Sequence, residues 1–202
     1  MSGTRFLALG DSYTIGEQVE PGARWPVQLA ALLRAGGSRV DDPEIIATTG
    51  WTTDELAAGI ARVAPIGPYA LVSLLIGVNN QYRGRPLATY EAEFRALLTQ
   101  AIGFAGGAAA RVVVLSIPDW GVTAFAEGRD RVAIAREIDA FNAAARAATT
   151  AAGARWVDVT PASRERRAGW EAADGLHPAG VQYGAWAALA LAPARAALAG
   201  AG

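Results

Sequence analysis

The stretch of residues 6–12 reads FLALGDS, four apolar residues followed by a glycine, an aspartate and a serine. Its four consecutive apolar residues do not alternate with polar ones, so they predict a strand buried on both faces, which is typical of parallel sheets covered by helices. Further apolar runs, each bounded by turn-forming residues, predict four more strands of the same sheet. These runs are Glu44–Ala47, Tyr69–Ile76, Arg111–Ser116 and Arg155–Val159.

Segments with helical periodicity separate these runs, and Thr52 and Glu55 have the spacing of a capping box at the start of one of them. The expected helices are Trp25–Arg34, Thr52–Val63, Thr89–Phe104, Arg131–Ala152 and Ala179–Leu198. The alternation of strands and helices predicts an α/β fold, a three-layer sandwich around a five-stranded parallel sheet. No linker or change of composition divides residues 1–202, so one domain is expected.

The composition excludes several classes of function. Net charge is −1, and the 18 cationic residues are arginines scattered along the chain, so no nucleic-acid partner is expected. The absence of Cys and the single His exclude thiolate chemistry and zinc sites with two imidazoles, and we expect no metal. The N-terminus lacks the apolar run of a signal peptide, which predicts a cytoplasmic protein unless a leader was removed. Pro193 and Arg195 interrupt the Ala-rich last helix, so it is expected to cover the sheet, and no transmembrane segment is expected.

Candidate functional residues lie in loops after the predicted strands, because ligands of open parallel sheets bind beyond the carboxyl ends of the strands. Ser12 follows the first run and is either a nucleophile or a helix N-cap, and Asp11 beside it is interpreted as a carboxylate that braces the loop. Gly50 and Asn79 follow the second and third runs. Each is either a turn or helix-entry residue or a source of an N–H donor to an oxyanion.

The imidazole of the chain lies in DGLHP, residues 174–178. A carboxylate at Asp174 can accept the ring N–H of His177 and hold one tautomer, which leaves the other ring nitrogen free as a base. Alone, such a histidine is more often a surface or structural residue. Its predicted position at the same sheet edge as Ser12, Gly50 and Asn79 favours catalysis.

Together these blocks resemble the GDSL, or SGNH, hydrolase family, whose four marker residues are matched by Ser12, Gly50, Asn79 and His177. GDSY at residues 10–13 and DGLHP match its first and last blocks, and the similarity runs from Thr4 to about Tyr183. The third block reads GVNN at residues 77–80, where the family commonly has Gly-x-Asn-Asp, so Asn80 replaces an acidic residue by a neutral one.

The resemblance implies a flavodoxin-like SGNH fold and a serine esterase that needs no cofactor. Ser12 would attack the ester, His177 would take its proton and Asp174 would orient the imidazole, while the N–H groups of Ser12 and Gly50 and the Asn79 side chain would hold the oxyanion. The G-x-S-x-G signature of α/β-hydrolases is absent, because Thr14 stands at its second glycine.

The expected partner is a small-molecule ester, which Trp51, Asn80, Tyr82 and Trp120 are expected to contact. The largely polar segment 117–130 argues against a hydrophobic lid, so short acyl groups are expected. The resemblance also permits lysophospholipids, thioesters and acetylated carbohydrates. Two other readings lack catalysis: a flavodoxin-like phosphate binder, which leaves Asp174 and His177 without a task, and a carbohydrate-binding relative, against which the intact triad argues.

Overall fold

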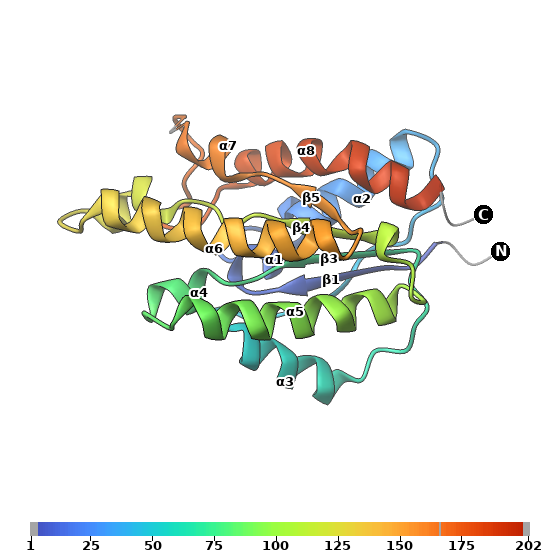
Figure 1. The fold of residues 1–202 in the computed structure, drawn as a ribbon. Helices are drawn as coiled ribbons and strands as arrows, with labels where there is room; N and C mark the ends of the chain where they lie inside the picture. The colour runs from blue at the N-terminus through green and yellow to red at the C-terminus, as the bar shows by residue number, and fades with distance from the viewer. Residues whose placement is uncertain (1–3, 166, 200–202) are drawn as a thin grey trace.

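The computed structural model describes residues 4–165 and 167–199, with a five-stranded parallel sheet at the centre (Figure 1). Its strands are β1 (Phe6–Gly10), β2 (Glu44–Ala47), β3 (Leu71–Leu75), β4 (Val112–Leu115) and β5 (Arg155–Val157). Every residue of β1, β3 and β4 is buried, whereas the edge strands β2 and β5 are partly exposed. The continuous apolar runs therefore mark a sheet covered on both faces, as predicted.

The strand β5 ends two residues earlier than its apolar run predicted. Polar side chains take over the backbone N–H groups that follow it: Ser116 Oγ accepts from Val159 at 2.8 Å, and Asp158 Oδ1 accepts from Thr160 at 3.1 Å. An apolar run does not show where side chains replace the neighbouring strand as hydrogen-bond partners.

Strand order places the functional loops at one edge. The order β2-β1-β3-β4-β5 means that the chain leaves β1 towards one side to form β2 and then crosses to the other side to form β3. Such a reversal opens a crevice between the loops after β1 and β3, where ligands of open α/β sheets bind. In Figure 1 the carboxyl end of β1 points to the end of the molecule where α4 (Val78–Tyr82) lies.

Helices cover both faces of the sheet. Figure 1 shows α2 (Trp25–Ala35) and α8 (Gly180–Ala199) together on one face, and α3 (Thr53–Val63), α5 (Leu87–Phe104) and α6 (Arg131–Ala151) on the other. The shorter elements, which the sequence did not predict individually, are α1 (Ser12–Ile15), α4, α7 (Thr160–Arg164) and the 3-10 turns Pro21–Ala23, Ala109–Arg111, Trp120–Val122 and Ala124–Ala126. The predicted capping box is present at the start of α3, where the Thr52 N–H donates to Glu55 Oε2 at 2.9 Å.

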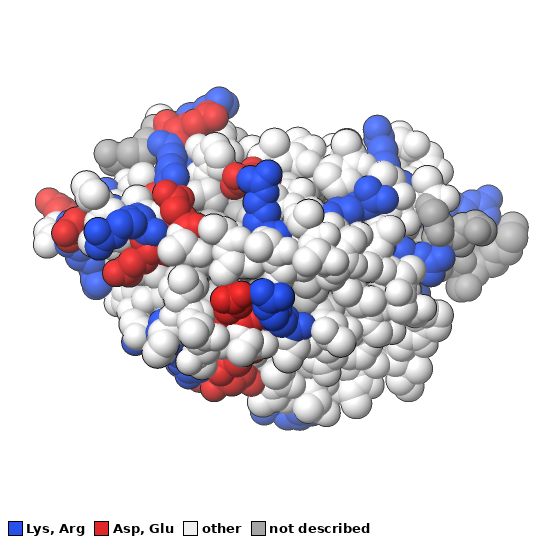
Figure 2. Space-filling model, in the orientation of Figure 1, with Lys and Arg blue, Asp and Glu red and all other residues white. Residues whose placement is uncertain are grey.

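The surface charge is mixed in the view of Figure 2. Basic and acidic side chains lie side by side at the end where α4 is found and α6 begins, so no broad area of one sign forms there. Within residues 4–165 and 167–199, none of the helices combines the length and the apolar character needed to cross a membrane.

Candidate active site

Ser12 is the first residue of α1, directly after β1. Asp11 caps this helix: its Oδ1 accepts the N–H of Tyr13 at 3.0 Å, as the loop-bracing interpretation predicted. The Ser12 N–H is one of the first backbone donors of α1, which have no acceptor within a helix. The capped turn therefore presents both the hydroxyl and the N–H of Ser12 at the end of β1.

The turn into α1 requires a residue without a side chain at position 10. A Cβ on Gly10 would lie 2.2 Å from Thr14 Oγ1 and 2.5 Å from the carbonyl oxygen of Leu75. Both distances are shorter than any real contact, so glycine lets the chain turn tightly against β3. This close approach brings Ser12 to the crevice between β1 and β3.

His177 and Asp174 form a pair in the loop before α8. The distance between His177 Nδ1 and Asp174 Oδ2 is 2.6 Å, and Asp174 Oδ1 also accepts the backbone N–H groups of Leu176 and His177 at 3.0 Å each. Partial burial alone would raise the pKa of Asp174, but the hydrogen bonds from His177 and Leu176 outweigh it and hold this pKa below its ordinary value. The carboxylate is thus kept ionised to accept a ring N–H. The Tyr13 ring and the imidazole pack in a T-shaped arrangement, with ring centroids 5.9 Å apart.

Gly50 and Asn79 come from the loops after β2 and β3. Gly50 has φ = +86°, a left-handed conformation that glycine adopts without strain. Asn79 Nδ2 donates to the carbonyl oxygen of Trp51 at 2.9 Å, and this bond uses one of its two amide hydrogens. The second hydrogen remains available to another acceptor.

A cavity of about 170 Å³ brings these loops together. Ser12, Gly50, Asn79 and His177 all line it, so the residues that the sequence placed at one sheet edge meet in one space. The remaining lining residues are Tyr13, Thr49, Val78, Tyr82, Trp120, Phe125 and Leu176. Tyr13, Thr49, Val78 and Leu176 were not singled out from the sequence, although each is adjacent to a motif residue.

Three aromatic rings form one wall of this cavity. The ring centroids of Tyr82 and Trp120 lie 5.4 Å apart, and that of Phe125 lies 6.0 Å from Trp120. Trp120 is held by a 2.8 Å hydrogen bond from its Nε1 to Gln81 Oε1. The guanidinium of Arg129 lies between 5.1 and 5.4 Å from the three ring centroids. The wall is therefore a fixed aromatic surface with a cation held over it.

Two residues expected to contact the substrate do not line the cavity, and both expectations are corrected. The Trp51 side chain packs on α3, where a Cβ on Gly59 would lie 2.2 Å from its ring. Asn80 is completely buried, and its amide pairs with Thr53: Oδ1 accepts the Thr53 N–H at 3.1 Å and Nδ2 donates to Thr53 Oγ1 at 2.7 Å. Its role is to join α4 to α3.

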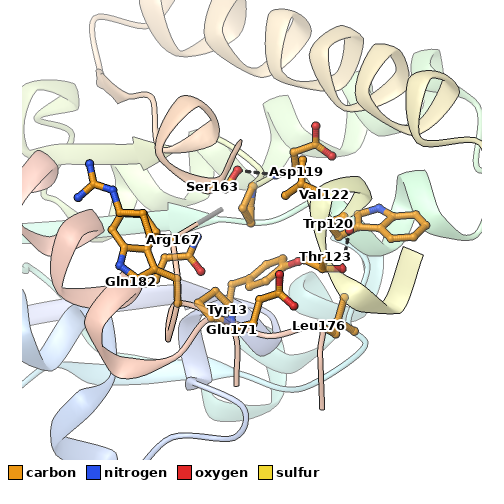
Figure 3. A pocket seen from close by; sticks show the side chains of 13 residues that line it. Tyr13, Asp119, Trp120, Val122, Thr123, Ser163, Arg167, Glu171, Leu176 and Gln182 are labelled. Carbon is orange, nitrogen blue, oxygen red and sulfur yellow. Dashed lines mark hydrogen bonds between the residues drawn. The ribbon is translucent and has the colours of Figure 1, made fainter. Parts of the chain in front are cut away.

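A second cavity, of about 20 Å³, shares Trp120 with the aromatic wall and is drawn in Figure 3. Tyr13, Trp120 and Leu176 line both cavities, and Trp170 lines this smaller one. The loop that carries Trp120 is braced here, because the Asp119 N–H donates to Ser163 Oγ at 2.9 Å. The volume suits about one water molecule, so this cavity is too small for a substrate.

Among the described residues, no group of three or more His, Cys, Asp or Glu side chains is arranged to hold a metal ion. What the main cavity offers is a hydroxyl at a helix N-terminus, a carboxylate-bound imidazole and a free amide hydrogen. These are the groups used for acyl transfer through a serine nucleophile.

The comparisons with known proteins agree with this geometry. The GDSL-like lipase/acylhydrolase family matches residues 8–184. Among solved structures, one named TesA has a TM-score of 0.73 at 19% identity and covers 94% of this chain and 97% of its own. A variant of Axe2, an acetyl-xylooligosaccharide esterase from Geobacillus, has a TM-score of 0.73 at 21% identity, with 96% and 94% covered.

A third structure, the esterase EstA from Pseudoalteromonas, has a TM-score of 0.69 at 16% identity and covers 95% of this chain and 97% of its own. No curated protein matches the sequence. At these identities the solved structures establish the fold, and the family match covers most of the chain. The chain belongs to the GDSL-like lipase/acylhydrolase family, and it is a carboxylic ester hydrolase.

Proposed function

We propose that the protein is a serine esterase that works through an acyl-enzyme, with Ser12 as nucleophile, His177 as general base and Asp174 as the group that orients the imidazole. The observation that carries this proposal is the cavity lined by both Ser12 and His177. The imidazole of His177 is held by Asp174, whose Oδ2 lies 2.6 Å from Nδ1. Because Nδ1 is engaged, Nε2 is the nitrogen left to exchange a proton with Ser12. We further propose that residues 1–202 form one hydrolase domain.

In the first half of the reaction, Ser12 Oγ bonds to the ester carbonyl carbon while His177 Nε2 takes the hydroxyl proton. Collapse of the tetrahedral intermediate breaks the bond to the alkoxy oxygen, which leaves with the proton from His177. In the second half, water attacks the acyl carbon, His177 takes a proton from that water, and the carboxylic acid leaves as the proton returns to Ser12 Oγ. Asp174 stabilises the imidazolium that exists between these transfers.

The oxyanion of each tetrahedral intermediate would accept hydrogen bonds from the N–H groups of Ser12 and Gly50 and from the Asn79 side chain. Support comes from the placement of all three residues on the cavity wall. Asn79 is fixed by its bond to the Trp51 carbonyl, so its second amide hydrogen is oriented before the substrate arrives. Donors fixed in advance stabilise developing charge without reorganising during the reaction.

The size of the cavity supports a preference for short acyl groups. Its volume is about 170 Å³, whereas a dry cavity of about 150 Å³ in another protein accommodates benzene, a molecule of six carbons. The reacting carbonyl and part of the alcohol must share this space. We therefore propose that activity is highest with acyl chains of about two to four carbons.

A carbohydrate acetylesterase is a second candidate within this function. An open cavity of about 310 Å³ adjoins the main one at Tyr82 and Trp120 and is also lined by Gln81, Glu137 and Arg129. Aromatic faces beside hydrogen-bonding side chains suit a sugar ring. Axe2, with the same fold, is an acetyl-xylooligosaccharide esterase. Release of acetate from acetylated xylooligosaccharides at a higher kcat/KM than from aryl acetates would select this candidate.

The test of the general proposal is hydrolysis of 4-nitrophenyl esters of two to twelve carbons by wild type, Ser12→Ala and His177→Ala. Each variant should lose several orders of magnitude in kcat. Ser73→Ala is the matched control, because Ser73 is also buried at the sheet but has no hydrogen-bond partner among the described residues. If Ser12→Ala keeps more than about a tenth of the activity, the proposed nucleophile is wrong. An optimum at eight or more carbons would indicate a lysophospholipase or thioesterase.

A further inference from the structure

Asn80, where the family commonly has an aspartate, belongs to a chain of three buried or half-buried polar side chains. Its Nδ2 donates to Thr53 Oγ1 at 2.7 Å, and the Thr53 hydroxyl in turn donates to the carboxylate of Glu93 on α5. Asn80 and Thr53 are both completely buried. Because the amide Nδ2 can only donate and the carboxylate can only accept, each hydrogen bond in this chain has a defined direction, from residue 80 to residue 53 to residue 93.

Counting hydrogens explains why residue 80 is neutral here. A threonine hydroxyl has one proton, and a carboxylate at Glu93 can only accept. Once Thr53 has given its proton to Glu93, its Oγ1 can only accept from residue 80. An asparagine can donate this bond, whereas an ionised aspartate would place a second acceptor against an oxygen with no proton left to give.

The same chain of hydrogen bonds ties together two of the three loops that hold the proposed oxyanion donors, namely the loops of Gly50 and Asn79. Thr53 begins α3, three residues after Gly50, and Asn80 follows Asn79 directly. The Asn80 amide binds both the N–H and the hydroxyl of Thr53. Asn79 binds the carbonyl of Trp51, which lies between Gly50 and Thr53 in the sequence. Three hydrogen bonds thus set the position of one loop relative to the other.

We propose that Asn80 is a positioning residue for catalysis and that its amide is matched to Glu93 through Thr53. This proposal rests on the proposed function, because it assumes that Gly50 and Asn79 stabilise the oxyanion. Asn80 itself does not touch the substrate. It acts by holding the two donors at one separation, and only a side chain that donates to Thr53 can do so while Glu93 accepts.

The test reverses the direction of the hydrogen-bond chain. In Asn80→Asp the new carboxylate competes with Glu93 for one hydroxyl proton, and kcat should fall about tenfold or more with little change in KM, because displaced donors weaken transition-state binding. In Asn80→Asp combined with Glu93→Gln, the glutamine amide donates to Thr53 Oγ1, and the Thr53 hydroxyl donates to the carboxylate introduced at position 80. This pair should return kcat to within about threefold of wild type.

Glu93→Gln alone should keep nearly full activity, because its amide oxygen can still accept from Thr53. In a Thr53→Val background, Glu93→Gln should no longer rescue Asn80→Asp, since the shared hydroxyl is gone. Thermal unfolding of each variant accompanies the kinetics. If Asn80→Asp does not fold, Glu93→Gln should restore both folding and activity.

The proposal is overturned if Asn80→Asp is as active as wild type, or if Glu93→Gln fails to restore the variant. Failure of the proposed function appears separately, as activity that survives Ser12→Ala. The two results are independent, because the rescue compares variants that all keep Ser12.

Discussion

Replacement of Asp11 by Asn should change the pH dependence of stability. Asp11 is completely buried next to the proposed nucleophile, and burial raises the pKa of its carboxyl to about 7, although the N–H of Tyr13 opposes this by donating to Oδ1. Its other oxygen, Oδ2, has no hydrogen-bond partner within residues 4–165 and 167–199. The pKa values of Tyr13 and Tyr90 are raised mainly by the burial of their own side chains and secondly by the negative charge of Asp11.

The sign and size follow from linkage. Since the pKa rises from 3.8 to about 7 on folding, the folded protein binds the proton more tightly than the unfolded chain. Stability from this group is therefore complete below pH about 4 and is lost as the pH rises through about 7. At about 1.4 kcal/mol for each pH unit, the loss amounts to about 4 kcal/mol. Asparagine keeps an acceptor for Tyr13 and does not ionise, so the variant should not show this loss.

The assay is urea unfolding of wild type and Asp11→Asn at pH 4 and pH 8. The unfolding free energy of the variant minus that of wild type should be larger at pH 8 than at pH 4, by up to about 4 kcal/mol, because only wild type loses stability over this range. Any cost of burying the amide group, about 1–3 kcal/mol, is independent of pH and cancels in this comparison. The exposed Asp41 provides the control variant, Asp41→Asn. If this difference is the same at the two pH values, the argument that burial raises the pKa of Asp11 is wrong.

Three further outcomes are expected. Asn79→Ala should lower kcat about a hundredfold with KM little changed, because a donor to the oxyanion acts in the transition state; a change in KM alone would contradict this role. Phe125→Ala opens the aromatic wall and should move the preferred acyl chain to greater length, and an unchanged optimum in the ester series would show that this wall does not limit chain length. Hydrolysis should be unaffected by EDTA, because the proposed serine mechanism uses no metal ion, whereas EDTA inhibition that is reversed by added metal would contradict this mechanism.

The sequence predicted the sheet and its covering helices well because burial on both faces leaves a direct trace in composition. The apolar runs correspond to all five strands, and the predicted helices correspond to the five long ones. Strand ends were less predictable. At β5 the hydroxyl of Ser116, from a loop far away in the sequence, takes over the hydrogen bonds, and no local pattern indicates such a partner.

The meeting of Ser12, Gly50, Asn79 and His177 in one cavity was predictable for a similar reason. Parallel strands place all their carboxyl ends at one edge, so residues 12, 50, 79 and 177 converge once the sheet is known. Substrate-contacting side chains do not follow from this rule. Trp51 lies in the correct loop, yet its ring packs against α3 because Gly59 leaves a space for it.

The adjacent pair Asn79 and Asn80 shows why identical residues take different places. Both belong to the short helix α4, where successive side chains point about 100° apart because a turn contains 3.6 residues. Asn79 faces the cavity, whereas the Asn80 side chain faces α3 and bonds to Thr53, whose hydroxyl in turn bonds to Glu93 on α5. The two amides therefore donate to different acceptors, Asn79 to the Trp51 carbonyl and Asn80 to the Thr53 hydroxyl. In our proposal, the asparagine at position 80, where the family commonly has an aspartate, is explained by Glu93, which lies 13 residues further along the chain.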